Sequence, residues 1–268
     1  MTINFSLAHL TVLSLSPPQI VQVAARTGYR TVGLRLIAVT DTTPGYPLMH
    51  DPALMRATKA AMNDTGIGVS DIEFVKITPE FDVAGMEPFL AAGAELGAKY
   101  VVTAPYDADL ARLSDRLASI ADLAAQYRLC PVLEFFPWTS VPDLATALKV
   151  VEETGRSNTG ILVDTLHFNR SASTLDQLAQ IPANRLPLMH ICDAPVQANY
   201  TTDELLHTAR AERLPPGEGQ IDIKRIHQCM PQGISIGLEV PMTRLSATHG
   251  PEAVALRVRQ AAEHLLSA

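Results

Sequence analysis

The chain has 268 residues, of which 47% are hydrophobic and 5% aromatic, so it can bury one large core built mainly from aliphatic side chains. Its net charge of −7 argues against a nucleic-acid partner, because proteins that bind phosphate backbones carry a basic face. Three scattered cysteines without a CxxC pair, no signal peptide and no membrane-length apolar run predict a cytoplasmic protein without a membrane partner.

Short apolar runs alternate with longer amphipathic stretches from one end of the chain to the other, as expected for parallel strands covered by helices. The predicted strands are residues 3–7, 31–36, 68–74, 100–104, 131–135, 160–163, 186–191 and 235–239. Eight strands separated by helices predict one α/β domain over residues 1–268 with the (β/α)8 TIM-barrel fold.

Helix boundary signals lie between these strands. Ser16-Pro17-Pro18-Gln19, Asp51-Pro52 and Gly250-Pro251 are typical helix starts. Gly28, Gly66 and Gly155 stand where helices should end before the next strand. Two long segments, residues 38–51 and 193–220, interrupt the alternation after the second and seventh strands. We expect them to have functional roles, because barrel enzymes build their sites from loops at this face.

Acidic or imidazole side chains stand at the ends of the last four predicted strands, and these are Glu134, Asp164, His190 and Glu239. In a closed barrel they would converge on the mouth, where three carboxylates repel one another unless a cation is present. The same four strand ends offer no basic residue as a partner. The set therefore predicts one divalent ion, Mn²⁺ in the first place, with Mg²⁺, Co²⁺ or Zn²⁺ as alternatives.

These motifs resemble the sugar phosphate isomerase/epimerase superfamily, the xylose isomerase-like barrels that also include apurinic-site endonucleases. Residues 164–167, Asp-Thr-Leu-His, are similar to the family's Asp-Thr-x-His, and residues 216–219, Pro-Gly-Glu-Gly, resemble its site-closing loop. The resemblance implies the same four metal ligands. The nuclease branch needs an Asp-x-His where this chain has Ala211 and Arg213, and a histidine that strand four lacks, which argues against nuclease activity.

The resemblance implies an enzyme of carbohydrate metabolism that isomerises or epimerises a sugar or sugar-like hydroxy-ketone. The metal ion would stabilise an enediolate while Glu134 and Glu239 remove and return a proton on opposite faces. His167 would orient a hydroxyl, shuttle a proton or support the metal site. A dehydratase of a cyclic hydroxy-ketone, such as an inosose or 3-dehydroshikimate, is the main alternative. An apurinic-site endonuclease and a non-catalytic sugar-binding barrel are more distant ones.

Six further residues are candidates for binding the substrate, a small carbohydrate or hydroxy-acid: His9, Arg35, Glu73, Lys76, Trp138 and Arg213. Arg35, Lys76 and Arg213 would favour an anionic substrate. Alternatively, Arg35 pairs with Glu73 and Lys76 points to solvent. Trp138 either forms a wall for a sugar ring or caps the barrel mouth. For the assembly of the chain, a homo-oligomer and a monomer are both alternatives.

Overall fold

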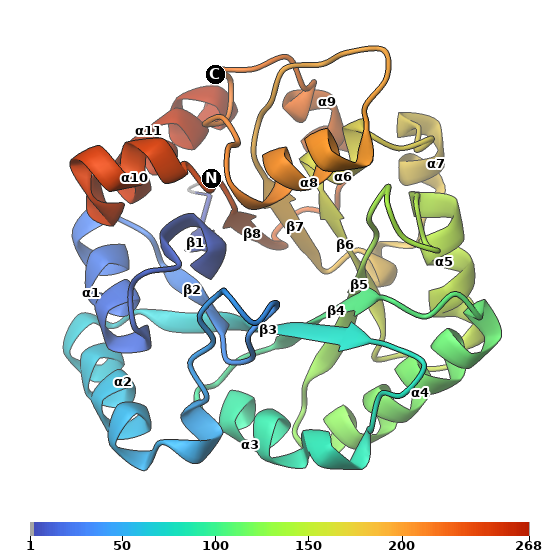
Figure 1. Ribbon diagram of the computed structural model, residues 1–268, viewed down its shortest axis with the longest axis horizontal. Coiled ribbons are helices and arrows are strands. Elements are labelled where there is room, and N and C mark those ends of the chain that lie inside the picture. Colours follow the sequence, from blue (N-terminus) through green and yellow to red (C-terminus); the bar gives the residue numbers. More distant parts are fainter. Residues whose placement is uncertain (1–2, 268) are drawn as a thin grey trace.

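A computed structural model describes residues 3–267 as a closed barrel of eight parallel strands, with β1 pairing with both β2 and β8. Helices surround the strands (Figure 1). The strands are β1 (Phe5–Leu7), β2 (Thr31–Arg35), β3 (Gly68–Ile77), β4 (Tyr100–Pro105), β5 (Cys130–Glu134), β6 (Gly160–Asp164), β7 (Leu188–Ile191) and β8 (Ser235–Leu238). The predicted barrel fold is confirmed, and strand ends differ from the prediction by at most three residues.

The helices follow the predicted order around the barrel. They are α1 (Pro17–Thr27), α2 (Pro52–Thr65), α3 (Glu87–Glu95), α4 (Leu110–Gln126), α5 (Leu144–Glu153), α6 (Thr165–Asn169), α7 (Leu175–Gln180), α8 (Thr202–Arg210), α9 (Ile223–Cys229), α10 (Thr243–His249) and α11 (Pro251–Ser267). Asp51 caps α2 by accepting a hydrogen bond from the Leu54 N–H at 2.9 Å, and Gly66 ends it with φ +73°. None of the helices within residues 3–267 is long and apolar enough to cross a membrane.

The alternation of side-chain direction along β5, β6 and β7 places the polar residues of the site. A small buried cluster includes Val132, Leu162 and Leu188, on β5, β6 and β7. Two residues further along the same strands stand Glu134, Asp164 and His190. Since side chains two apart share a face of a strand, the polar groups stand directly beyond this apolar cluster.

The long segment after β7 contains a helix, α8, which was not predicted because the sequence of this segment is polar. Thr201 caps α8, and its N–H and hydroxyl donate to the Glu204 carboxylate at 2.8 and 2.9 Å. Leu205 and Ala209 are its buried residues, so its apolar stripe is too narrow to stand out in the sequence. The segment then returns to β7, where Asp193 and Leu214 form an antiparallel bridge.

Candidate metal centre and active site

The four predicted metal ligands meet at the mouth of the barrel. Glu134, Asp164, His190 and Glu239 each offer one ligand atom, and these atoms lie within 4.8 Å of one another. All four residues are at most 5% exposed. Gly237 makes room for the imidazole, because a Cβ there would lie 2.6 Å from His190 Cδ2. The strand ends therefore bring three carboxylates and one imidazole together, as the sequence predicts.

Several polar atoms of this cluster have no hydrogen-bond partner within the described chain. They are Glu134 Oε1 and both ring nitrogens of His190. The nearest carboxylate contact of the His190 ring is 3.7 Å, from Nδ1 to Glu239 Oε2, too long for a hydrogen bond. Buried polar atoms without partners are costly. A donor set of three carboxylates and an imidazole fits a divalent ion, which would bind Glu134 and one ring nitrogen of His190.

A basic residue, Arg213, reaches the cluster from the segment after β7. Arg213 is 2% exposed, and its guanidinium lies 2.7 Å from Asp164 Oδ2 and 2.8 Å from Glu239 Oε2. The four strand ends offer no basic residue, as expected, but the inference that the carboxylates therefore lack a basic partner is wrong, because a distant loop folds back over them. Charge repulsion alone does not demand a metal ion here. The unpartnered atoms and the donor set carry that argument instead.

The charged groups of the cluster change one another's pKa values. Burial and the Glu239 carboxylate raise the pKa of Glu134. Burial opposes ionisation of Asp164 and Glu239 too, but Arg213 and His190 together help to outweigh it, and both pKa values lie below their usual range. Burial alone would lower the pKa of His190, yet Glu239 and Glu134 raise it to about 10. Without a metal ion His190 carries a proton, which a bound ion must displace.

His167 stands beside the cluster, on the short helix that follows β6. Its Nε2 lies 3.7 Å from Glu134 Oε1, and its Nδ1 has no partner within residues 3–267. Burial lowers the pKa of His167 to about 4, so the ring is neutral at pH 7. The rings of Phe136 and Trp138 meet it edge-on, with centroids 4.7 and 5.2 Å away.

A cavity of about 110 Å³ lies directly against these groups. Glu134, His167, Arg213 and Glu239 line it on the polar side. Its apolar wall consists of the rings of Phe74, Tyr106, Phe136 and Trp138. The segment after β2 contributes Val39, Thr40 and Thr43, and α8 contributes Ala209 and Arg210. Both long segments expected to be functional therefore border this cavity, and Trp138 stands in its wall.

Arg35 and Glu73 form a buried ion pair with a 3.1 Å distance between Nη2 and Oε1. Arg35 lines the cavity, but Glu73 and Lys76 are not among its lining residues. The Lys76 ammonium donates to the Val39 carbonyl and lies 5.2 Å from the centre of the Tyr106 ring. Lys76 thus anchors the loop after β2 and does not point to solvent. Arg213 is likewise engaged with Asp164 and Glu239, so the three cations on which the expectation of an anionic substrate rested all contact groups of the protein itself.

His9 is a structural residue, contrary to the expectation that it faces the pocket. Its Nδ1 accepts a hydrogen bond from the Arg35 N–H, and its Nε2 lies 2.8 Å from the Leu15 carbonyl. The ring stacks on Tyr46 with centroids 5.0 Å apart. Both nitrogens are thus engaged, and His9 joins the segment after β1 to β2 while its ring packs against the loop after β2.

Asp193, which directly follows the His190 strand, is a site residue that the sequence interpretation missed. Its Oδ2 accepts hydrogen bonds of 2.9 Å from the Gly217 and Gly219 N–H groups. Its Oδ1 accepts from the Ala194 and Ile221 N–H groups at 2.8 and 3.0 Å. This 1% exposed carboxylate holds the Pro-Gly-Glu-Gly segment against the barrel. An acid between an apolar strand and a glycine-rich loop was the available signal.

Fold and site together define a (β/α)8 barrel with a buried carboxylate–imidazole cluster at the face where barrel enzymes carry out chemistry. The chain belongs to the xylose isomerase-like TIM barrel family, whose family model matches residues 21–267.

Three known proteins illustrate the similarity. An inosose isomerase of Bacillus velezensis is 30% identical over 139 residues, which cover 48% of this chain and 47% of that protein. The match thus spans about half the length of this curated relative. The solved IOLI protein with a bound zinc atom has a TM-score of 0.80 at 18% identity, covering 99% of this chain and 98% of that one. The probable 3-DHS dehydratase AsbF of Bacillus anthracis has a TM-score of 0.75 at 18% identity, covering 97% and 98%.

Proposed function

We propose that this protein is a divalent-metal-dependent isomerase or epimerase of a sugar or sugar-like hydroxy-ketone. One observation carries the proposal: Glu134 and Glu239 belong to the four-residue cluster and also line the adjacent cavity. A substrate in that cavity meets both carboxylates. The inosose isomerase relative supports the reaction class, and the zinc-bound IOLI structure supports a divalent ion.

Glu134, Asp164, His190 and Glu239 would hold the ion, which when bound supplies positive charge to stabilise the negative charge that develops on the substrate oxygens. Glu239 remains ionised beside Arg213 and is suited to accept the proton from the carbon next to the carbonyl. Glu134, the other cluster carboxylate that lines the cavity, would return a proton. Proton removal and return at two carboxylates is general acid–base catalysis.

His167 and the aromatic wall position the substrate in this proposal. The His167 ring is neutral, and its unpartnered Nδ1 is available to a substrate hydroxyl. Phe74, Phe136 and Trp138 offer apolar ring faces and edges, against which the C–H face of a sugar-like ring packs. Because Arg35 is paired with Glu73, we assign a neutral hydroxy-ketone in preference to a hydroxy-acid or phosphorylated sugar.

A dehydratase is the second candidate, supported by the structural similarity to AsbF. It needs a general acid for the leaving hydroxyl, and His167 is the neighbouring group that can serve. Its pKa of about 4 makes this ring a poor proton donor at pH 7, because the imidazolium form is scarce. The protonation state of His167 therefore ranks proton transfer without loss of water first.

Incubation with inososes and keto-sugars in D₂O, with Mn²⁺ supplied, tests the proposal. We expect NMR to show deuterium at the carbon next to the carbonyl in the substrate and in an isomeric product. The Glu239→Gln variant serves as the control for exchange catalysed by buffer or metal. Accumulation of an unsaturated, dehydrated product would favour the dehydratase. Absence of exchange with every substrate of the panel would contradict both candidates.

A further inference from the structure

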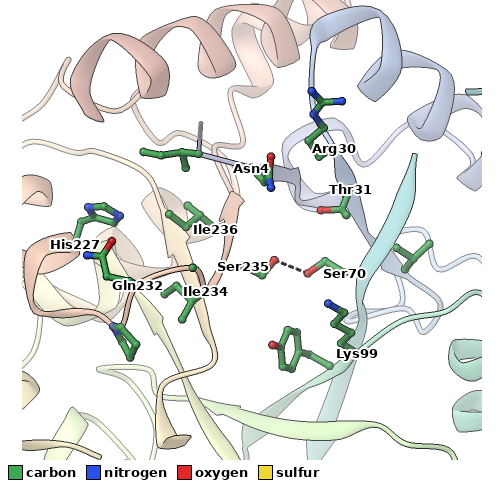
Figure 2. Close-up of a pocket in the computed structure, with 15 residues that line it drawn as sticks. Asn4, Arg30, Thr31, Ser70, Lys99, His227, Gln232, Ile234, Ser235 and Ile236 are labelled. Atoms are coloured by element: carbon green, nitrogen blue, oxygen red, sulfur yellow. Dashed lines mark hydrogen bonds between the residues drawn. The ribbon is translucent and has the colours of Figure 1, made fainter. Parts of the chain in front are cut away.

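A second and larger cavity, of about 500 Å³, lies at the opposite end of the barrel. It is lined where β1, β2, β3, β4 and β8 begin, and by α9. We call it the basal pocket and define it by Asn4, Arg30, Ser70, Lys99, His227 and Ser235. Figure 2 shows these side chains around one space, with Arg30 and Lys99 on one side and His227 on the other. The cavity volume is in the usual range for small-molecule sites.

The charge of the basal pocket is opposite to that of the protein. The chain carries a net charge of −7, yet Arg30 and Lys99 line the pocket and no carboxylate within the described residues does. Neither cation forms an ion pair within residues 3–267. Asp71 is the nearest carboxyl along β3, and burial raises its pKa to about 7. The local balance therefore favours an anion.

Neutral hydrogen-bonding groups stand between the two sides. Ser70 and Ser235 approach each other from β3 and β8, with 2.7 Å between their Oγ atoms (Figure 2). One of the two hydroxyl protons serves this contact, which leaves the other free for a ligand. The Tyr100 hydroxyl and the Asn4 and Gln232 amides add further polar groups to the lining. The pocket thus combines two unpaired cations with neutral donors.

We propose that the basal pocket binds a small organic phosphate. Arg30 and Lys99 would contact the phosphate, and the free hydroxyl proton of the Ser70–Ser235 pair would be donated to it. A tetrahedral phosphate presents oxygens in several directions, so a guanidinium and an ammonium can each contact it. Val69, Ile234 and Ile236 supply apolar contacts for the carbon skeleton. This site is separate from the carboxylates at the barrel mouth and does not depend on the function assigned to them.

Isothermal titration with glycerol 3-phosphate, in the presence of EDTA, tests the proposal without phosphate–metal coordination. We expect one molecule to bind per chain. Lys99→Ala and Arg30→Ala should each weaken binding about tenfold or more, the loss typical of one charge-assisted hydrogen bond. Arg56→Ala is the matched control, since Arg56 is an exposed cation on α2 away from the pocket. It should change the affinity less than about twofold.

Three results would overturn the proposal. The first is the absence of binding heat at millimolar ligand. The second is equal affinity in wild type and both pocket variants, which would place the anion elsewhere, for example at Arg210 near the mouth. The third is equally tight binding of malonate, which would show recognition of carboxylates in place of phosphate. Circular dichroism confirms folding of the variants, and both substituted side chains are exposed.

Discussion

The two ends of the barrel use charge in opposite ways. At the mouth, Arg213 is 2% exposed and pairs with carboxylates that are also buried. At the base, Arg30 and Lys99 are exposed and lie around a cavity more than four times larger. Charges interact strongly where water is excluded and weakly where solvent screens them. The mouth therefore suits the stabilisation of developing charge, and the base suits reversible binding.

The largest expected effect is the loss of catalysis on substitution at the mouth of the barrel. Glu239→Gln keeps the shape of the side chain but removes a base and a charge at the mouth. We expect kcat to fall about 10²–10⁴-fold with the far-ultraviolet circular dichroism unchanged. Glu152→Gln, an exposed change on α5, should leave kcat as in wild type. Turnover by Glu239→Gln at the wild-type rate would reduce Glu239 to a structural anchor.

The second prediction compares the stability of variants that lose a cation at the mouth or at the base of the barrel. Arg213→Met leaves Asp164 and Glu239 buried without their cation, so the metal-free protein should lose about 3–5 kcal/mol of unfolding free energy. Lys99→Met at the base removes an exposed amine that forms no ion pair among the described residues, and we expect a change within about 0.5 kcal/mol. Urea denaturation in EDTA measures both. Equal losses in the two variants would contradict the contrast between buried and solvated charge.

Asp193 tests how the mouth is closed. In Asp193→Asn one oxygen becomes an NH₂ group, which faces two backbone N–H donors that it cannot accept from. We expect a loss of about 2–3 kcal/mol and faster hydrogen exchange either at the Gly217 and Gly219 amides or at the Ala194 and Ile221 amides, depending on which oxygen is replaced. Asp64→Asn, an exposed change on α2, is the control. Unchanged exchange at all four amides that donate to Asp193 would show that this carboxylate does not hold the segment.

The last prediction concerns the pH dependence of stability. Burial lowers the pKa of His9 to about 4 in the folded protein, against about 6.5 when unfolded. Between these values the unfolded chain binds more protons, so the free energy of unfolding should fall as the pH drops from 6.5 to 4.5. His9→Asn should remove about 2–3 kcal/mol of this dependence. The exposed control His264→Asn should retain the wild-type slope, and an equal slope in His9→Asn would contradict the assignment.

The residues that local patterns predict well are those at the ends of strands. Glu134, Asp164, His190 and Glu239 each end or follow an apolar run, and closure of the barrel is enough to bring them together. The position of Arg213 depends on the path of a long segment through α8. Local periodicity does not encode that path, so its pairing with two of the predicted ligands was not anticipated.

The sequence did not determine the partner of Arg35 for a related reason. Strand register places Arg35 opposite Glu73, but sequence alone does not show whether the two side chains meet or face a ligand. The contacts of Lys76 with Val39 and of His9 with Leu15 depend on loop conformations. Non-local loop contacts therefore account for most of the corrected site assignments, whereas strand periodicity accounts for the fold and the metal-ligand set.

Anomalous diffraction from crystals grown with Mn²⁺ is the most direct test of the metal centre. We expect one peak per chain between Glu134, Asp164, His190 and Glu239, within coordination distance of all four side chains. The peak should disappear in crystals treated with EDTA. Absence of a peak at saturating Mn²⁺, or a peak away from these side chains, would contradict the account of a metal-dependent enzyme.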